Sequence, residues 1–328
     1  MYFSILKSTE ELACPGAFTG AGISREAALT ASRLEGHELI SLFALANSVR
    51  HKRRGDLVDI CAIVNAKSGG CTEDCAYCAQ SGRAKTGIKS YPLLPIKEMV
   101  FNAQKAHEAG AKRFCVVTSG KKPDKKELAS IAKAITAIRK AGVLPCATLG
   151  ILGADELRLL KDAGLERYHN NLETSERFFP QVCTTHTYKE KLKTAEAAKR
   201  AGLSLCSGGI FGLGETWEDR VDMAMELKRL EADSVPINFL IPVKGTKLEK
   251  SGVLPPLEAL KIISIYRLLL PRREIRVCGG RFQCLGEFNS FVFAAGADGI
   301  LTGNYLTKSG RPPQEDIKLI KDFGLSPA

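Results

Sequence analysis

The sequence predicts a (β/α)8 TIM barrel with a short helical N-terminal extension. From residue 57 onward, eight short apolar or β-branched runs alternate with amphipathic stretches. Strict alternation of strand and helix indicates a parallel sheet, and eight repeats indicate closure into a barrel. Four of the runs come just after an Ala-Gly pair, where a glycine can end a helix in the left-handed conformation: Gly110, Gly142, Gly164 and Gly202.

The elements are predicted in chain order as follows. Apolar residues at roughly helical spacing between 28 and 46 predict helices in an extension over 1–55, ahead of one barrel domain over 56–328. The predicted strands are 57–64, 113–118, 144–149, 166–171, 204–211, 234–240, 274–277 and 298–301. The predicted helices are 96–109, 126–141, 154–163, 189–201, 217–230 and 257–270, one after the seventh strand, and a last one near 316–323.

Composition narrows the class of protein. The 328 residues are 45% hydrophobic and 25% charged, as in a globular chain with a substantial core. We expect a cytoplasmic protein, because no apolar run could span a bilayer and residues 1–10 do not resemble a signal peptide. An odd number of cysteines, eleven, favours metal ligands over disulfides in a reducing compartment.

The net charge of +11 leaves nucleic acid open as a partner. The basic runs at 51–54 and 121–126 lack interleaved aromatic residues, which is more typical of a solvated surface. A docking face for an acidic electron carrier is the alternative interpretation.

Three cysteines lie within eight residues: Cys71, Cys75 and Cys78. The preceding Gly69-Gly70 pair lets the backbone turn tightly, so that the three sulfurs can converge. A closed structural zinc site normally needs four protein ligands, whereas three thiolates on a four-iron cluster leave one iron open. On spacing alone, a zinc knuckle without its fourth ligand, or a partly buried thiol cluster, stands as the alternative.

The spacing C-x3-C-x2-C, with Tyr77 just before the last cysteine, resembles the signature of the radical S-adenosylmethionine (SAM) enzymes. The resemblance implies a 4Fe-4S cluster on Cys71, Cys75 and Cys78, with SAM bound to the open iron. It also implies that one electron cleaves SAM to methionine and a 5′-deoxyadenosyl radical, which abstracts hydrogen from unactivated carbon.

Four more cysteines lie in, or at the end of, different predicted strands: Cys115, Cys146, Cys206 and Cys278. One buried strand cysteine is usually only a small hydrophobe. Four can aim inward together, because alternate side chains of each barrel strand face the lumen, and they could then hold a second metal cluster. The same alternation places Arg113 beside Cys115 and Arg276 beside Cys278, and we expect these cations to favour the thiolate.

Several stretches resemble the biotin synthase family of radical SAM enzymes: 71–81, 113–115, 146–150, 168–174, 206–216, 234–238 and 244–246. The resemblance covers nearly all of 57–326. It implies conversion of dethiobiotin to biotin with two SAM molecules per turnover, an electron donor such as flavodoxin or ferredoxin, and a homodimer. It also implies that a second cluster, usually 2Fe-2S held by three cysteines and an arginine matching Arg276, supplies the sulfur.

The chain departs from this family in two places. The usual Tyr-Asn-His-Asn-Leu-Asp reads Tyr-His-Asn-Asn-Leu-Glu from Tyr168 to Glu173, in the strand that should contact substrate and the SAM ribose. Cys278 stands where a serine is common, two residues after Arg276. A fourth thiolate would compete with a guanidinium for iron, so a four-iron auxiliary cluster with an extra sulfide is the alternative to the 2Fe-2S form.

The resemblance also implies binding residues. The glycine-rich run at 208–215 lacks the motifs of a P-loop or a dinucleotide fold. The expected SAM-binding residues are Tyr77, Asn171, Glu173, Gly208, Ile210 and Gly212. The expected substrate-binding residues are Lys67, for a carboxylate, and His169, Asn171 and Asn238, with a carboxamide suited to a cyclic urea. The remaining cysteines have no matching role and are interpreted as structural: Cys14, Cys61, Cys183 and Cys284.

Two kinds of alternative function stay open. A hydrogenase maturase or a methylornithine synthase would have a similar barrel but would not need the four strand cysteines. A zinc-dependent RNA-binding module would fit the basic charge, and metal analysis would distinguish it.

Overall fold

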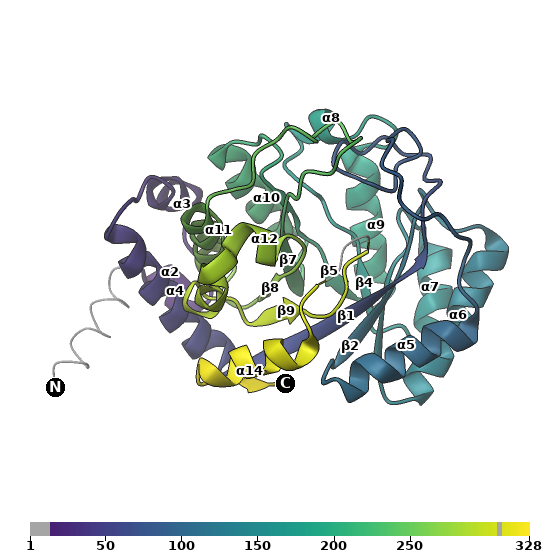
Figure 1. Cartoon of the computed structure of the whole chain (residues 1–328). Helices are drawn as coiled ribbons and strands as arrows, with labels where there is room; N and C mark the ends of the chain where they lie inside the picture. Colours follow the sequence, from purple (N-terminus) through teal and green to yellow (C-terminus); the bar gives the residue numbers. More distant parts are fainter. Residues whose placement is uncertain (1–13, 307–309) are drawn as a thin grey trace.

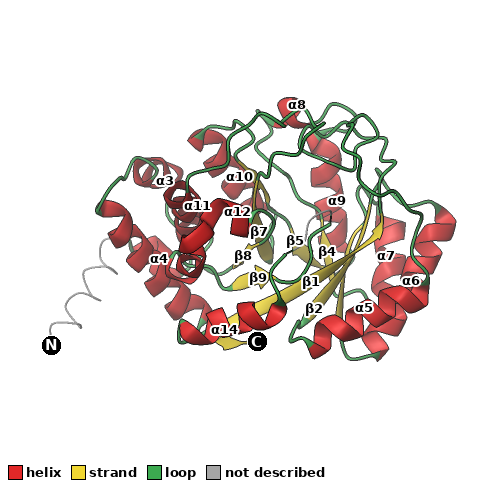
Figure 2. Ribbon diagram, viewed as in Figure 1, coloured by secondary structure: helices red, strands yellow, loops and turns green. Residues whose placement is uncertain are grey.

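Parallel strands close into a barrel at the centre of this computed structural model, which describes residues 14–306 and 310–328 (Figures 1 and 2). In sheet order the strands are β1 (Leu57–Lys67), β2 (Arg113–Thr118), β3 (Leu144–Thr148), β4 (Arg167–His169), β5 (Ser204–Cys206), β7 (Ser234–Phe239), β8 (Glu274–Val277) and β9 (Gly299–Leu301). Pairing of β9 with β1, in which Gly299 lies opposite Asp59, closes the ring. The predicted TIM-barrel fold class is confirmed.

Helices cover the outer face of the barrel (Figure 2). Those between strands are α5 (Ile96–Glu108), α6 (Lys125–Lys140), α7 (Ala154–Asp162), α9 (Tyr188–Arg200), α10 (Trp217–Arg229) and α11 (Pro256–Leu269). Shorter ones are α8 (Phe179–Val182), α12 (Arg281–Leu285), the 3-10 helix η1 (Gly286–Ser290) and α13 (Phe291–Ala294), and α14 (Pro313–Asp322) follows β9. The sequence placed the six main helices to within one residue at each end.

Local sequence signals explain these boundaries. At the start of α6, Asp124 accepts a hydrogen bond from the backbone of Glu127, whose carboxylate accepts one from the backbone of Asp124. At helix ends, the φ values of the four predicted glycines are positive: 93° at Gly110, 83° at Gly142, 98° at Gly164 and 73° at Gly202. The predicted helix-ending glycines are therefore confirmed.

The extension before the barrel consists of helices α2 (Pro15–Thr19), α3 (Arg25–Ala31) and α4 (Glu38–Arg54). Helix α4 packs against α11 on the outside of the barrel (Figure 1). The Lys261 ammonium also donates to the backbone oxygen of Ser32 at 2.9 Å. The predicted helical extension is thus observed over 15–54, and residues 1–13 lie outside the described part of the chain.

β1 runs three residues beyond the predicted 57–64, and β4 covers only 167–169 of the predicted 166–171. Two further features of the sheet differ from the prediction. The expected strand 204–211 is interrupted after Cys206, and β6 (Gly209–Phe211) pairs with β7 and, at Gly209, bridges to Glu173. The interruption falls at Gly208, which packs closely against β7: an added Cβ would lie 2.0 Å from the backbone oxygen of Pro236. The second feature is β10 (Ser326–Pro327), which pairs with the start of β1 and is too short to show a periodic pattern.

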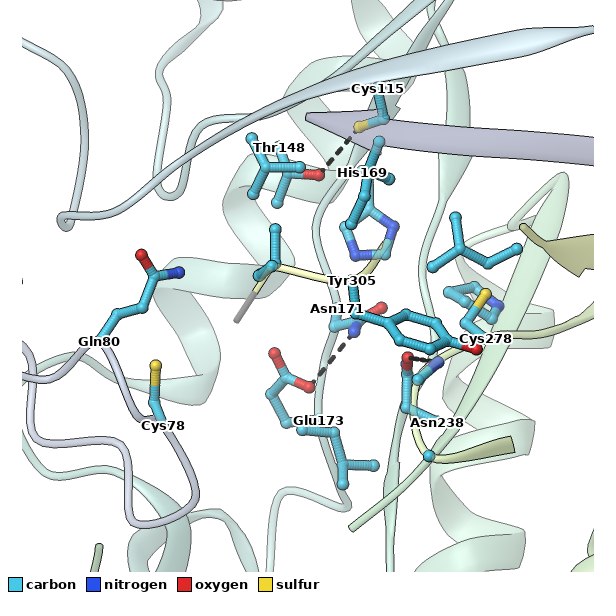
Figure 3. A pocket seen from close by; sticks show the side chains of 18 of the residues that line it. Cys78, Gln80, Cys115, Thr148, His169, Asn171, Glu173, Asn238, Cys278 and Tyr305 are labelled. Carbon is cyan, nitrogen blue, oxygen red and sulfur yellow. Dashed lines mark hydrogen bonds between the residues drawn. The ribbon is translucent and has the colours of Figure 1, made fainter. Parts of the chain in front are cut away.

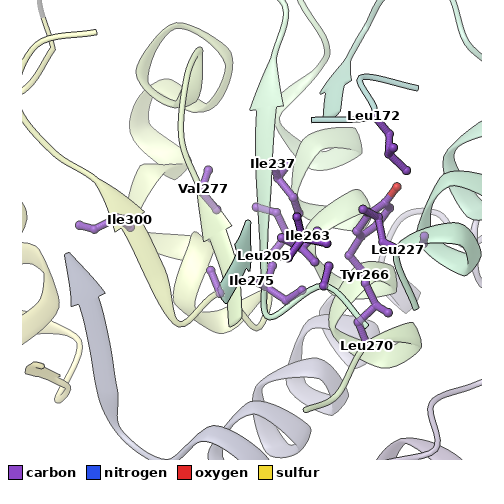
Figure 4. Close-up of a cluster of buried hydrophobic side chains, with 14 of the residues drawn as sticks. Leu172, Leu205, Leu227, Ile237, Ile263, Tyr266, Leu270, Ile275, Val277 and Ile300 are labelled. Carbon is purple, nitrogen blue, oxygen red and sulfur yellow. The ribbon is translucent and has the colours of Figure 1, made fainter. Parts of the chain in front are cut away.

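Buried apolar side chains fill the space between strands and helices (Figure 4). From the wall of the barrel, Leu205, Ile275 and Val277 point outward into this core, and Tyr266 of α11 meets them from the other side. Side chains alternate along a strand, so the residues next to these outward-facing ones point into the lumen. Those neighbours are Cys206, Arg276 and Cys278. None of the described helices has the length and apolar character needed to cross a membrane.

Candidate active site

A cavity of about 440 Å³ opens at the carboxyl ends of the barrel strands (Figure 3). Most of the predicted site residues line it: Cys71, Tyr77, Cys78, Cys115, Cys146, His169, Asn171, Glu173, Cys206, Ile210, Asn238, Arg276 and Cys278. Figure 3 shows Cys78 on one side of this space and Cys278 with Asn238 on the other. The structure therefore brings the cysteine loop and the strand cysteines to one cavity.

The cysteine loop, residues 69–82, follows β1 and turns back on itself. Gly69 and Gly70 have φ values of 73° and 60°, as the predicted tight turn requires. The backbone oxygen of Cys71 accepts a hydrogen bond from Gly82 at 2.7 Å, and the amide of Cys78 donates to the oxygen of Cys75 at 3.0 Å. These bonds fix the ends of the loop against each other. Cys71 and Cys78 line the cavity, whereas Sγ of Cys75 lies beside Cys183 and His186, so the structure does not gather the three loop sulfurs at one point.

A second segment, residues 182–186, anchors the loop from outside. Asp74 accepts hydrogen bonds from the backbone amide of Thr184 at 2.9 Å and from its hydroxyl at 2.6 Å. Burial raises the pKa of the Asp74 carboxyl, but the hydrogen bonds outweigh burial and hold that pKa well below its usual value. Glu73 lies 2.6 Å from Nδ1 of His186. The loop acids therefore serve as anchors in the described structure.

The four strand cysteines are buried deeper in the lumen: Cys115, Cys146, Cys206 and Cys278. Cys115 and Cys146 are register partners on β2 and β3. Cys61, which the sequence analysis interpreted as structural, packs in the same cluster of buried side chains as three of them. Cys61 lies two residues before Ile63 on β1, so both side chains face the same side of the strand, and both line the cavity. The alternation of side chains along the predicted strand could therefore have identified Cys61 from the sequence.

Burial outweighs the arginines at the four strand cysteines, although the positive charge of Arg276 favours each thiolate, as expected. Burial raises the pKa of Cys115 and Cys206, and raises that of Cys146 to about 11 and that of Cys278 to about 12. The charge of Arg276 acts in the opposite direction but is the smaller effect. The thiol form is favoured, so any metal bound here must supply the free energy of deprotonation.

Arg276 belongs to a network of buried ion pairs, which we call the polar floor, consisting of Arg113, Arg167, Arg276, Asp59 and Glu274. Arg276 donates to the carboxylates of both Asp59 and Glu274. Arg113 Nε lies 3.1 Å from Asp59, and Arg167 Nη1 lies 3.1 Å from Glu274. Arg113 is therefore paired with Asp59, and its positive charge lowers the pKa of Cys146 rather than that of Cys115.

Two polar atoms in the cavity wall fit a further bound group. Among the described residues, Arg113 Nη1 and Thr118 Oγ1 are buried and have no hydrogen-bond partner. Both residues line the cavity. Because unpaired buried donors are costly, these atoms suit a ligand in the lumen that accepts hydrogen bonds, such as a cluster sulfide or a substrate oxygen.

Strand β4 presents the altered family motif. His169 faces the lumen, with Nδ1 at 3.3 Å from Sγ of Cys206, whereas Asn170 points outward and donates to the backbone oxygen of Lys191. Exchanging the order of His and Asn therefore moves the imidazole from the outside of the barrel to the lumen. Burial lowers the pKa of His169 to about 4, so the ring is neutral at pH 7.

The rest of this segment holds Asn171 and Glu173 together. Asn171 Nδ2 donates to Oε2 of Glu173 at 3.3 Å, and its Oδ1 accepts from the amide of Gly208. Glu173 has a φ of 73°, which residues other than glycine rarely adopt, and such backbone strain is common at ligand sites.

The remaining predicted binding residues lie in different places. Asn238 lines the cavity, but its Oδ1 already accepts from Gly279 and its Nδ2 donates to Gly209. Lys67 is paired with Glu127 and does not line the cavity. Gly208 and Gly212 also lie outside the lining, whereas Ile210 packs in an apolar cluster with Tyr77.

Comparison with known proteins identifies the family. Residues 66–227 match the Radical SAM superfamily, and residues 236–326 match the Biotin and Thiamin Synthesis associated domain. A biotin synthase of Thermodesulfovibrio yellowstonii is 55% identical over 292 residues, covering 89% of this chain and 92% of its own length. The chain belongs to the biotin synthase family. A biotin synthase of Heliobacterium modesticaldum is 47% identical over 324 residues, 98% of each chain.

Solved structures share the fold at lower identity. Methylornithine synthase superposes with a TM-score of 0.83 at 20% identity, covering 96% of each chain. The FeFe-hydrogenase maturase HydG of Carboxydothermus hydrogenoformans superposes with a TM-score of 0.81 at 19% identity, over 99% of this chain and 80% of its own. These likenesses show the barrel alone. The biotin synthase family makes the chain a radical SAM enzyme of sulfurtransferase type and decides against both rival enzymes and the RNA-binding module. A 4Fe-4S cluster and SAM follow from the superfamily.

Proposed function

We propose that this chain converts dethiobiotin to biotin by sulfur insertion, consuming two SAM molecules per turnover. The observation that carries the proposal is the single cavity lined both by loop cysteines, Cys71 and Cys78, and by the four strand cysteines. A substrate bound between the two groups can be activated from the loop side and receive sulfur from the lumen side. The family membership supports the same reaction.

In this proposal the cysteine loop holds the 4Fe-4S cluster, which when bound supplies the reducing electron for SAM cleavage. Tyr77 and Ile210 form an apolar surface for the adenine, and Asn171 and Glu173 offer polar groups to the ribose. Asn238 and His169 face the same cavity and suit the cyclic urea of the substrate. The chain's own task is to orient these ligands and to exclude water from the reacting carbon.

We also propose that Cys278, and not Arg276, is the fourth protein ligand of an auxiliary cluster with Cys115, Cys146 and Cys206. Both terminal nitrogens of Arg276 are occupied: Nη1 donates to the backbone oxygens of Asp59 and Ile300, and Nη2 to two carboxylates. Ligation by this guanidinium would break bonds in a buried network, which is costly. The thiol of Cys278 faces the lumen and makes one long contact, 3.9 Å, to the oxygen of Arg276.

Two variants separate the cluster types. Cys278→Ser should lose or convert the auxiliary cluster and stop biotin formation, while SAM cleavage at the loop continues. Arg276→Lys keeps a positive charge for Asp59 and Glu274 and should be milder. Iron and sulfide analysis, Mössbauer spectroscopy of anaerobic protein and biotin yield would be compared for both. Full activity of Cys278→Ser would instead support the three-cysteine-plus-arginine cluster.

The reaction itself is tested with anaerobically purified enzyme, SAM, dithionite and dethiobiotin. We expect biotin and 5′-deoxyadenosine as products. Alanine at Cys71, Cys75 or Cys78 should abolish 5′-deoxyadenosine formation, because each supplies one of three protein bonds to the cluster. Normal formation in any of these variants would remove that cysteine from the site, and a colourless zinc protein would refute the function.

We propose, in addition, that flavodoxin or ferredoxin is the electron donor, that the enzyme is a homodimer and that it acts in the cytoplasm. The support is the family resemblance together with the net charge of +11, which suits an acidic electron carrier. Electron transfer to the loop cluster that weakens with rising salt would support the donor.

A further inference from the structure

The segment 182–186 lies beside the cysteine loop and brings one thiol close to another. The amide of Ala76 donates to the backbone oxygen of Val182 at 2.8 Å, and the amide of Asp74 donates to the hydroxyl of Thr185. Cys75 lies between Asp74 and Ala76, and Cys183 lies between Val182 and Thr185, so these two bonds bring the two cysteines side by side.

The side chains of this pair also lie close together. Sγ of Cys75, Sγ of Cys183 and a ring nitrogen of His186 are all within 4.8 Å of one another. A disulfide needs the two sulfurs about 2 Å apart, and these two already lie within 4.8 Å of each other. The gap that remains is within reach of side-chain rotation combined with a small shift of the loop.

Hydrogen bonds hold Cys183 in place to react. Its sulfur lies 3.2 Å from Oδ1 of Asp74 and 3.3 Å from Nδ1 of His186. That nitrogen is also 2.6 Å from the Glu73 carboxylate, so its proton can be donated to either group. Cys183 itself is only 4% exposed, whereas Cys75 is partly exposed and can meet a reagent from solution.

We propose that Cys75 and Cys183 form a reversible disulfide in enzyme that lacks its 4Fe-4S cluster, with a small disulfide such as oxidised glutathione as the oxidant. The Cys75 thiolate attacks one glutathione sulfur and releases the first glutathione. The Cys183 thiolate then attacks Sγ of Cys75 and releases the second. The two thiol protons end on the two glutathione molecules, and the two electrons lost by the cysteines reduce the one glutathione disulfide.

The disulfide would control cluster assembly. Cys75 is one of the three loop ligands, so a bond to Cys183 withdraws it from iron until a reductant restores the thiol. In cluster-containing enzyme Cys75 is committed to iron and should not react. The bond would thus store the empty site in a recoverable form and prevent irreversible oxidation of Cys75.

Peptide mapping tests the proposal. Clusters are removed anaerobically with a chelator and reductant, the desalted protein is treated with oxidised glutathione, and free thiols are alkylated before digestion with trypsin. Cleavage after Lys67 and Arg83 gives peptide 68–83, and cleavage after Arg177 and Lys189 gives peptide 178–189, whose single cysteine is Cys183. We expect a cross-link between these peptides that fragment ions assign to Cys75, and that dithiothreitol removes.

Matched variants sharpen the test. Cys183→Ser should lose the cross-link and accumulate glutathione on Cys75, because the second thiol is missing. Cys284→Ser changes a buried cysteine elsewhere in the chain and should keep the cross-link. Untreated holoenzyme should show neither product. A disulfide within peptide 68–83, or alkylation of both Cys75 and Cys183 in treated wild type, would overturn the proposal.

Discussion

The ammonium nitrogen of Lys67, at the end of β1, lies 2.6 Å from Oε1 of Glu127 at the start of α6. A lysine that is to bind a substrate carboxylate must give up this partner. The pair is only partly buried, with side-chain exposures of 29% and 19%, so the cost of separating the two charges is about 1 kcal/mol or less. If Lys67 binds the substrate carboxylate, Glu127 competes with the substrate for its ammonium group.

If Lys67 binds the carboxylate, Glu127→Gln should tighten dethiobiotin binding by up to about fivefold, because the competitor loses its charge. Glutamine can still complete the capping box of α6, so the helix is preserved. Lys67→Met should weaken binding, and the alcohol analogue of dethiobiotin should bind equally to all three proteins. Unchanged affinity for dethiobiotin in both variants would remove Lys67 from the site.

Asn238→Ala should weaken dethiobiotin binding by about 1–3 kcal/mol while both clusters stay intact, since polar groups of the urea would be buried unpaired. The affinity is measured by calorimetry on holoenzyme, with iron content as the control. Asn238 also bonds the backbone of Gly279 and Gly209. An equal loss of SAM affinity would show that this structural role, and not urea recognition, causes the effect.

Gly208→Ala should be strongly damaging. The new Cβ would lie 2.0 Å from the oxygen of Pro236, a backbone atom that cannot rotate away. We expect a loss of about 1–3 kcal/mol or more in the free energy of unfolding and weaker SAM binding, as the strands separate. Gly252→Ala is the matched control, because no atom lies within 4 Å of its added Cβ. Similar urea-unfolding midpoints for the two variants would contradict the packing argument.

Asp219, near the start of α10, should make stability depend on pH. Burial alone raises the pKa of its carboxyl, but hydrogen bonds from Ser175 and Thr216 outweigh burial, and the net pKa lies below its usual value. The unfolded chain therefore takes up a proton before the folded chain does. The stabilisation is fully present above about pH 4 and is lost as the pH falls further.

Asp219→Asn should accordingly cost about 1.5–3 kcal/mol at pH 7, because charge-assisted bonds at 2.6 Å and 2.9 Å to Ser175 and the Thr216 amide are weakened. The difference from wild type should shrink as the pH falls below 4. Urea unfolding from pH 3 to pH 7 measures this difference, and one that is constant with pH would rule out the titration.

The barrel and most of the cavity could be predicted because both follow from periodic signals. The alternation of side chains along each strand places Cys206, Arg276 and Cys278 in the lumen. The same alternation along β1 would have added Cys61. The split of strand 204–211 could not be predicted, and it falls where Gly208 closely approaches Pro236 on another strand. The contact of Cys183 with Cys75 was equally hidden, because it joins two loops that no periodic pattern connects.

The ion pairs of the site and the ionisation of its cysteines could not be predicted from the sequence either. Sequence spacing placed Arg113 and Arg276 beside thiols. It could not reveal that Asp59 forms ion pairs with both arginines, or that Glu274 forms a further one with Arg276. Nor could it reveal that burial would outweigh the remaining positive potential at Cys278. The carboxylates come from β1 and β8, and only closure of the barrel through β9 brings them together.

The polar floor also bears on the order in which ligands bind and leave. Its residues lie at the amino ends of the strands and its three arginines line the cavity, whereas the cysteine loop follows the carboxyl end of β1, so a ligand held against the polar floor lies below one held at the loop. A molecule that occupies the deep part of the cavity has to arrive before one that fills the mouth, and it cannot depart until the outer one has gone. If SAM binds beside the cysteine loop and dethiobiotin below it, the products of the first SAM must be exchanged above a substrate that stays in place.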